Sequence, residues 1–174
     1  MSNEHRDELL DTVSREVAEL QNATDAMDEA VAQRLGINRT DLRCLGLLFA
    51  RGPLSAGQLA SASGLSPGAA TTALDRLERA GYALRTRGAH DRRSVLIELT
   101  PLARQRIQEL YGPVGTEGRQ FLERYSDDEL RFLSAFLRDG RALQIKHVAL
   151  LRSQGNAHEG LPNPEQNVAE EQGG

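Results

Sequence analysis

The longest regular pattern of apolar positions in the chain lies close to its N-terminus. Residues on this pattern are spaced three and four apart: Leu10, Val13, Val17, Leu20, Thr24, Met27 and Val31. The spacing predicts one face of a helix over residues 7–35, with acidic residues on the other faces and Gly36 at its end. The length and near-heptad spacing favour packing against a second helix or subunit, and an amphipathic helix on an ordinary core is the alternative.

Shorter helical patterns follow, and each is opened by a residue type that caps helices. Thr40 is predicted to cap the apolar segment DLRCLGLLFA, which ends at a Gly-Pro pair. Ser55 opens a short helix that stops at Gly64. Ser66, followed by proline at the first helical position, opens another helix that runs through Ala80. Two short helices joined by a turn form a helix-turn-helix pattern.

The segments YALRTR and SVLIELT predict a two-stranded hairpin around the loop GAHDRR. Val95, Ile97 and Leu99 alternate along the second segment and share one face of a strand. A hairpin directly after a helix-turn-helix is typical of a winged helix-turn-helix, in which the second helix enters the major groove of DNA. We therefore predict a mostly α fold with a small β-hairpin wing, in the α+β class.

Two more helices are predicted after the hairpin. Thr100, followed by proline, caps a helix that reaches Gly112 and Pro113, which are able to kink or interrupt it. The capping box S-x-x-E that starts at Ser126 opens the last helix. The chain is then rich in Gly, Asn, Gln, Glu and Pro, and we expect residues 153–174 to be disordered.

Charge is distributed unevenly along the chain, whose net charge is −4. Residues 1–50 carry five arginines against ten acidic residues, whereas residues 51–100 carry seven arginines against four acidic residues. A local basic region matters more for binding a polyanion than the total charge does. The helix-turn-helix and the hairpin are therefore the candidate DNA-binding region.

The predicted hairpin loop contains His90, Asp91, Arg92 and Arg93, where little protein is available to bury the charges. Arginines at the tip of a wing suit a narrow minor groove, which concentrates negative potential. Asp91 fits as the partner that orients an arginine through a forked hydrogen bond. Together with Arg87 on the preceding strand, these residues are the candidates for DNA contact from the wing.

Three motifs in this region make a specific combination. They are L-A-x-x-x-G-L-S at residues 59–66, D-R-L-E-x-x-G at 75–81, and D-x-R at 91–93 followed by L-T at 99–100. On these motifs the chain resembles the MarR family of bacterial transcriptional regulators. The resemblance extends over about residues 9–150 and is weakest in the outer helices.

The resemblance implies a homodimer that binds a palindromic operator in double-stranded DNA, as a repressor. Residues 1–36 and 101–152 would form the dimer body, residues 37–100 the DNA-binding lobe, and residues 153–174 the tail. The candidate dimer contacts are Leu10, Val13, Val17, Leu20, Leu133 and Leu137. The resemblance also implies a small aromatic or phenolic effector that binds between body and lobe and releases the operator.

The second helix of the helix-turn-helix supplies the remaining candidates for DNA contact: Ser66, Pro67, Gly68, Ala69, Thr71, Thr72 and Arg76. Backbone N–H groups of Ser66, Gly68 and Ala69 are expected to reach a phosphate. Thr71 is expected to touch a thymine methyl group or a base edge.

Arg76 is expected to reach a guanine or a phosphate, and a structural ion pair with Asp75, Glu78 or Asp91 is the alternative. Many relatives carry a basic residue where Thr72 stands and a polar or basic one at the preceding proline position. The helix therefore has few long polar side chains. Base specificity is then expected to depend more on Arg76, on DNA shape and on the wing.

No catalytic or metal-binding pattern is visible in the sequence. The histidines, at positions 5, 90, 147 and 158, lack the short spacing of metal ligands, and no nucleophile motif, P-loop or H-E-x-x-H motif occurs. Cys44 is interpreted as a buried, inert thiol. We expect no enzyme activity, cofactor or metal.

The N-terminal segment lacks the apolar region of a signal peptide, and no apolar run reaches membrane-spanning length. We therefore expect a cytoplasmic protein, associated with the nucleoid when bound to DNA, and no membrane partner. The alternative function is a dimeric ligand-binding or protein-interaction module that kept the winged fold without binding DNA. Replacing Arg92 and Arg93 by alanine distinguishes the two hypotheses.

Overall fold

The computed structural model describes residues 3–87 and 95–158 of the chain. In chain order its elements are α1 (Asn3–Leu35), α2 (Arg39–Arg51), α3 (Ala56–Ser63), α4 (Pro67–Arg79), β1 (Ala83–Arg87), β2 (Val95–Leu99), α5 (Pro101–Leu122) and α6 (Asp127–His158). The predicted class, mostly α with a small hairpin, is confirmed. The chain divides into two compact units, Met1–Thr116 and Glu117–Gly174.

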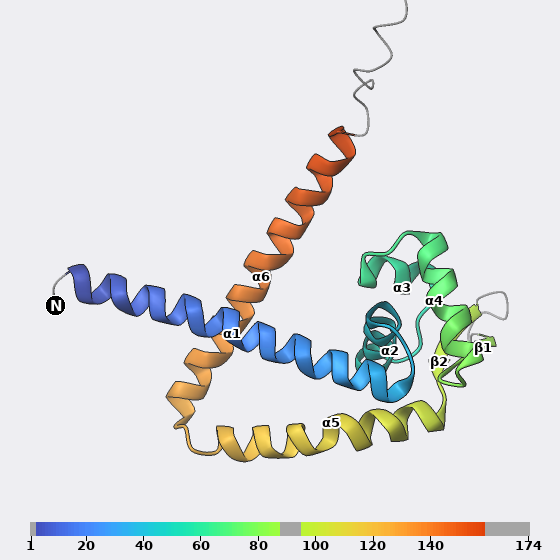
Figure 1. Cartoon of the computed structure of the whole chain (residues 1–174), viewed down its shortest axis with the longest axis horizontal. Helices are drawn as coiled ribbons and strands as arrows, with labels where there is room; N and C mark the ends of the chain where they lie inside the picture. Colours follow the sequence, from blue (N-terminus) through green and yellow to red (C-terminus); the bar gives the residue numbers. More distant parts are fainter. Residues whose placement is uncertain (1–2, 88–94, 159–174) are drawn as a thin grey trace, which may run out of the picture. The chain divides into compact units, whose positions relative to one another are not determined.

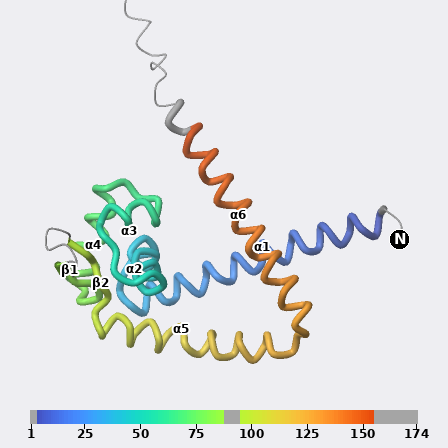
Figure 2. The backbone as a smooth tube through the Cα atoms, turned by 180° about the vertical axis from the view of Figure 1, so that it is seen from behind, coloured from blue at the N-terminus to red at the C-terminus, as the bar shows by residue number. Residues whose placement is uncertain are grey.

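In the first unit, the C-terminal end of α1 and helices α2, α3 and α4 gather into one cluster with the hairpin (Figure 1). Seen from behind, the hairpin lies at the edge of this cluster beside α4 (Figure 2). The centre of the core is formed by side chains with almost no exposure to solvent: Leu45, Leu48, Leu59, Leu74, Leu77 and Ile97. Burying leucine and isoleucine side chains stabilises the lobe by about 2 kcal/mol each.

Local capping explains where the helices of this cluster begin. Ser55 and Gln58 form a capping box at the start of α3, and Gly64 ends that helix in the left-handed conformation, with φ of 70°. The hydroxyl oxygen of Ser66 accepts a hydrogen bond from the backbone N–H of Ala69 and caps α4. These predicted boundaries are confirmed, because each depends on side chains next to the helix end.

The prediction that Thr40 caps α2 is wrong. Asn38 is the cap, because its backbone is extended and its side-chain oxygen accepts the N–H of Asp41 at 2.9 Å. Thr40 already lies within the first turn of the helix. Helix α1 also begins earlier than predicted, at Asn3.

The two strands of the hairpin are antiparallel, with Ala83 opposite Leu99 and Arg87 opposite Val95. Leu54, in the loop after α2, exchanges two backbone hydrogen bonds with Ile97 and so attaches the hairpin to the helices. The loop that joins the strands, residues 88–94, lies outside the described residues.

Helix α5 does not stop at Gly112 and Pro113 but continues through both to Leu122. Proline removes one backbone donor from a helix, and α5 continues on both sides of it. The predicted start is confirmed, because the Thr100 hydroxyl oxygen accepts the N–H of Ala103. No helix in the described ranges is long and apolar enough to cross a membrane.

Helix α6 is one continuous helix in the second unit (Figure 1, orange to red). The predicted capping box is confirmed, because Glu129 accepts the N–H of Ser126 and Ser126 accepts that of Glu129. The helix runs to His158. The prediction of disorder from residue 153 is therefore wrong for residues 153–158, which continue the last turns of α6. Residues 159–174, the rest of the predicted tail, lie outside the described residues.

Candidate functional site

The outer face of α4 carries the candidate DNA contacts of the helix-turn-helix. Ala70, Ala73, Leu74 and Leu77 point into the core, so the opposite face is turned to solvent. The exposed residues at its N-terminal end are Ser66, Pro67, Gly68, Ala69, Thr71 and Thr72. A methyl group added at Gly68 would meet nothing within 4 Å, so this position is open to a partner.

The threonines of α4 use their hydroxyl protons within the helix. The hydroxyl of Thr71 donates to the carbonyl of Pro67 at 3.0 Å, and that of Thr72 donates to the carbonyl of Gly68 at 3.0 Å. A carbonyl oxygen only accepts, so each hydroxyl is the donor. What both side chains can still offer a partner is therefore their methyl group and the lone pairs of the oxygen.

Arg76 is joined to α2 by a forked pair of hydrogen bonds. Its Nε donates to Oδ2 of Asp41 at 2.8 Å and its Nη2 donates to Oδ1 at 2.6 Å. The side chain of Asp41 is only 2% exposed, whereas that of Arg76 is 34% exposed. The hydrogen bonds to Asp41 raise the pKa of the Arg76 guanidinium. The pair connects the start of α2 to the middle of α4.

The structural ion pair expected as the alternative role of Arg76 is therefore present, but its partner is not Asp75 or Glu78. Asp41 lies 35 positions before Arg76 in the sequence. An acidic residue in the first turn of a helix is ordinary, because it favours the helix dipole, so nothing in the sequence pattern marks Asp41. Asp41 is buried against Arg76 only because the fold brings α2 and α4 together.

The hairpin is attached to α4 by a second ion pair. Arg85 on β1 donates to Oδ1 of Asp75 at 2.8 Å and also bonds Glu78. These contacts raise the pKa of the Arg85 guanidinium, with the hydrogen bond to Asp75 as the largest cause. Both acids lie on α4, so the strand is held beside the helix that carries the candidate DNA contacts.

Only part of the predicted wing site can be placed. Arg87 is exposed at the end of β1. The other candidates in the loop, His90, Asp91, Arg92 and Arg93, lie outside the described residues. Their contact with DNA stays a prediction from the sequence.

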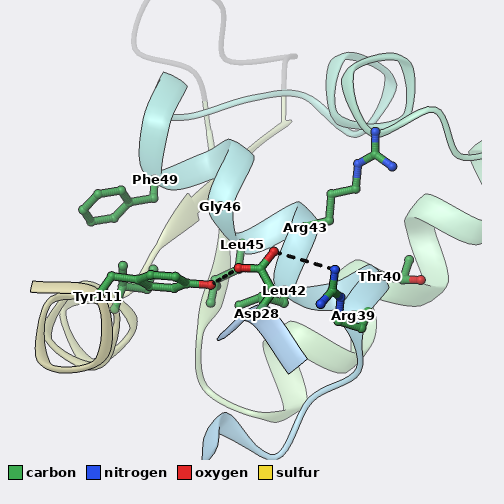
Figure 3. A pocket seen from close by; sticks show the side chains of 10 residues that line it. Asp28, Arg39, Thr40, Leu42, Arg43, Leu45, Gly46, Phe49 and Tyr111 are labelled. Atoms are coloured by element: carbon green, nitrogen blue, oxygen red, sulfur yellow. Dashed lines mark hydrogen bonds and ion pairs between the residues drawn. The ribbon is translucent and has the colours of Figure 1, made fainter. Parts of the chain in front are cut away.

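A cavity of about 660 Å³ lies in the first unit between α1, α2 and α5 (Figure 3). Apolar side chains and two arginines line most of it: Leu42, Leu45, Phe49, Ile107, Arg39 and Arg43. Asp28 and Tyr111 also line it, and the Tyr111 hydroxyl donates to Oδ1 of Asp28 at 2.6 Å. This combination of apolar walls and a few polar groups is typical of a small-molecule site. No motif or periodicity in the sequence marks its lining residues as a group.

The charges around the cavity are unevenly paired. Arg39 lies 2.5 Å from Oδ1 of Asp25 and 3.8 Å from Oδ2 of Asp28. Burial, with the Asp28 carboxylate, raises the pKa of the Tyr111 phenol, which therefore stays protonated at neutral pH. Among the described residues no carboxylate pairs with Arg43, whose guanidinium lies apart from the Asp28–Arg39 pair in Figure 3. Arg43 is therefore a cation of the cavity lining that no described carboxylate neutralises.

The predicted dimer residues are divided between the two units. On α1, Leu10, Val13 and Leu20 are about half exposed, at 54%, 47% and 62%. On α6, Leu137 is 61% exposed. Val17 and Leu133 are partly exposed. Apolar side chains at this exposure on helical faces are typical of surfaces that another chain covers.

The chain is similar to known proteins in both sequence and fold. The sequence model of the MarR family matches residues 37–95. A relative in Bacillus subtilis (strain 168), the uncharacterized HTH-type transcriptional regulator YcgE, is 34% identical over 147 residues. The match covers 84% of this chain and 94% of YcgE.

Solved structures share the fold at lower sequence identity. A MarR family protein from Bacillus stearothermophilus superposes with a TM-score of 0.59 at 23% identity, over 83% of this chain and 99% of that one. NadR, solved in complex with 4-hydroxyphenylacetate, gives a TM-score of 0.56 at 21% identity, over 73% of this chain and 90% of that one.

Proposed function

Because the chain belongs to the MarR family of DNA-binding transcriptional regulators, we propose that it is a repressor that binds a palindromic operator as a homodimer. The exposed face of α4, held beside the hairpin by Arg85, is the observation that carries this proposal. In a winged helix-turn-helix, the second helix of the motif enters the major groove. Here that helix is α4.

The two ends of α4 and the wing have different roles in this proposal. Backbone N–H groups of Gly68 and Ala69 approach a phosphate at the helix N-terminus, where the helix dipole favours an anion. Arg87, Arg92 and Arg93 supply positive charge from the wing. Arg76 acts mainly through Asp41, since both of its hydrogen bonds to that carboxylate hold it against α2. It thereby positions α4 on the lobe.

The exposed apolar faces of α1 and α6 support the homodimer. A face with Leu10 and Leu20 half exposed is costly in water unless a partner covers it. A two-fold dimer presents two copies of α4 to DNA, so the operator would be a palindrome with half-sites about one helical turn apart.

The cavity beside α2 is the proposed effector site, and its chemistry favours an aromatic anion. Phe49, Leu42 and Ile107 provide apolar walls, and Arg43 provides a cation that is not neutralised by a described carboxylate. The protonated Tyr111 hydroxyl, which donates to Asp28, adds a polar group to the lining. NadR, which shares the fold, binds 4-hydroxyphenylacetate, a ligand of this class.

The start of α2 gives a physical route from effector to DNA. Thr40 and Leu42 line the cavity, and Asp41 between them holds Arg76 of α4. An effector that shifts this turn of α2 moves Asp41 and, through it, α4. The effector would then favour a lobe position that does not fit the operator, which is a population shift.

Footprinting and transcription in vitro on the DNA that flanks the gene test the repressor proposal together. The expected result is a symmetric protected region that overlaps a promoter, with transcription decreasing as protein is added. Protection without any loss of transcription would contradict repression while leaving DNA binding intact. An asymmetric footprint of half the length would contradict the palindromic dimer.

A further inference from the structure

The N-terminal half of α4 has few side chains with which to read a base pair. Residues 67–72 carry no charge, and Thr71 and Thr72 hold the only side-chain hydroxyls among them. Recognition helices contact base edges mainly with their N-terminal residues. The base-reading chemistry of α4 therefore depends largely on these two threonines.

Each of the two threonine hydroxyls donates its proton in a hydrogen bond within α4. Each donates at 3.0 Å to a carbonyl of its own helix, Thr71 to Pro67 and Thr72 to Gly68. Guanine presents two acceptors, N7 and O6, in the major groove, so reading it requires a donor. The threonines offer no donor in this arrangement, although each oxygen still accepts.

The longer polar side chains of α4 are engaged elsewhere. Arg76 is bound to Asp41 through Nε and Nη2, and Asp75 is bound to Arg85. Arg79 lies in the last turn, far from the helix end that enters the groove, and its Nε donates to the carbonyl of Asp75. These contacts remove the guanidinium groups from the part of α4 that reads bases.

Apart from the two threonine oxygens, the side chains of residues 67–72 offer only apolar groups. Pro67, Ala69, Thr71 and Thr72 are exposed, and a methyl group added at Gly68 would meet nothing within 4 Å. An A·T pair offers a matching surface, because thymine carries a C5 methyl and adenine presents an N6 amino donor to the threonine oxygen. Gly68 lets the DNA approach closely enough for these contacts.

We propose that α4 reads its half-site through thymine methyl groups, with Thr72 and Thr71 as the specificity-determining residues, and makes no hydrogen bonds to guanine from residues 67–72. This inference rests on the proposed function, since it assumes that α4 enters the major groove. It assigns a preference for A·T pairs to the positions that residues 67–72 face.

The test begins with the full chain and a pool of random duplex DNA, from which the bound sequences are selected. In the selected half-site, uracil replaces each thymine in turn, which removes only the methyl group. The expected loss at each contacted position is roughly fourfold, the amount that burying one methyl contributes. In the same half-site, 7-deazaguanine replaces each guanine, and no loss is expected at positions that face α4.

Variants of Thr72 identify which group makes the contact. Thr72→Val keeps the methyl group and removes the hydroxyl, so the variant should keep the preference for thymine over uracil. Thr72→Ser keeps the hydroxyl and removes the methyl group. At the position that Thr72 contacts, this variant should bind the thymine and the uracil DNA with equal affinity. Thr116→Ser is the matched control, because Thr116 is an exposed helical threonine on α5 whose hydroxyl also donates to a carbonyl four residues earlier.

The outcomes separate this inference from the proposed function. Sequence-specific binding that is insensitive to uracil but weakened by 7-deazaguanine would overturn the inference and leave the regulator intact. The reverse behaviour of the variants, with Thr72→Val losing specificity and Thr72→Ser keeping it, would also overturn it. Failure to select any sequence would contradict DNA recognition itself, and the inference would fall with it. Circular dichroism of each variant checks that the helix is intact.

Discussion

The carboxylate of Asp41 and the guanidinium of Arg76 differ sharply in their exposure to water, at 2% and 34% of their side chains. A buried charge without its partner is much more costly than a partly exposed one, because only the latter regains hydration. The pair therefore stabilises the lobe in an asymmetric way. The loss in free energy of unfolding therefore depends on which of the two residues is removed.

We predict that Arg76→Ala lowers the free energy of unfolding more than Asp41→Ala does. The arginine variant leaves the buried Asp41 carboxylate unpaired, which costs about 2–3 kcal/mol. Urea unfolding of both variants and of the double variant measures the difference, with Arg104→Ala as a surface control. The double variant should recover part of the loss. Equal costs for the two single variants would show that the pair is not desolvated as the structure indicates.

A second residue-scale prediction concerns Cys44, which is fully buried in the core of the lobe. Burial, and after it the nearby Asp41, raises the pKa of the Cys44 thiol, so the reactive thiolate is scarce at neutral pH. We expect no reaction with a thiol reagent at pH 8 in the folded protein and complete reaction in denaturant. Rapid reaction of the folded protein would mean that this part of the core opens readily.

At the scale of elements, α2 contributes both to the cavity and to the contact with α4. Arg43 and Phe49 face the cavity, and Asp41 faces α4. Because a helix turns as a unit, a ligand that displaces one face displaces the other. The element is the physical basis for the proposed coupling between effector and operator.

The effector prediction uses 4-hydroxyphenylacetate and its neutral amide as probes. If Arg43 binds the carboxylate, Arg43→Ala should lower the binding affinity for the acid by about tenfold, which is the contribution of one hydrogen bond to a charged group. The affinity for the amide should not change. Calorimetry measures both, with Arg104→Ala as the control. An equal loss for acid and amide would mean that Arg43 shapes the cavity without binding the anion.

The helix-turn-helix and the hairpin were predictable because their signals are local. Ser55, Ser66 and Thr100 each cap the helix that follows directly. Asn38 and Thr40 both belong to capping residue types, and only the folded backbone shows that Asn38 has the extended conformation of a cap.

The site was less predictable, because its contacts join distant segments. The Asp41–Arg76 pair spans 35 positions and the Asp28–Tyr111 hydrogen bond spans 83. Neither pair has a periodicity or a motif of its own. The candidate DNA contacts were chosen from the family motifs, whereas the cavity forms only when three helices are placed around it.

At the scale of the whole molecule, assembly decides whether two lobes can act together. The apolar positions on α1 and α6 are exposed in the single chain, and their pattern requires a covering surface. In the proposed dimer, two lobes would bind two half-sites with a high effective concentration for the second contact. Loss of the dimer should therefore weaken operator binding even though each α4 is unchanged.

We predict that the protein is a dimer at micromolar concentration and that Leu20→Glu shifts it toward monomer, because the charge is placed on the apolar face of α1. Sedimentation measures the mass, and operator affinity should fall in parallel. Gln21→Glu is the matched control, since it adds the same charge at the neighbouring exposed polar position. A wild-type monomer, or a Leu20→Glu dimer of unchanged stability, would contradict the assigned interface.

The most direct test of the central claim, sequence-specific DNA binding by α4 and the wing, is a gel-shift titration on the DNA that flanks the gene. Wild type, Arg93→Ala and Arg104→Ala are compared at two salt concentrations. We predict a shift that weakens as salt increases, and a weaker shift with a smaller salt dependence for Arg93→Ala, because one phosphate contact is lost. Binding by Arg93→Ala equal to that of wild type at both salt concentrations would contradict the account of the wing, and absence of any shift on flanking or selected DNA would contradict the function.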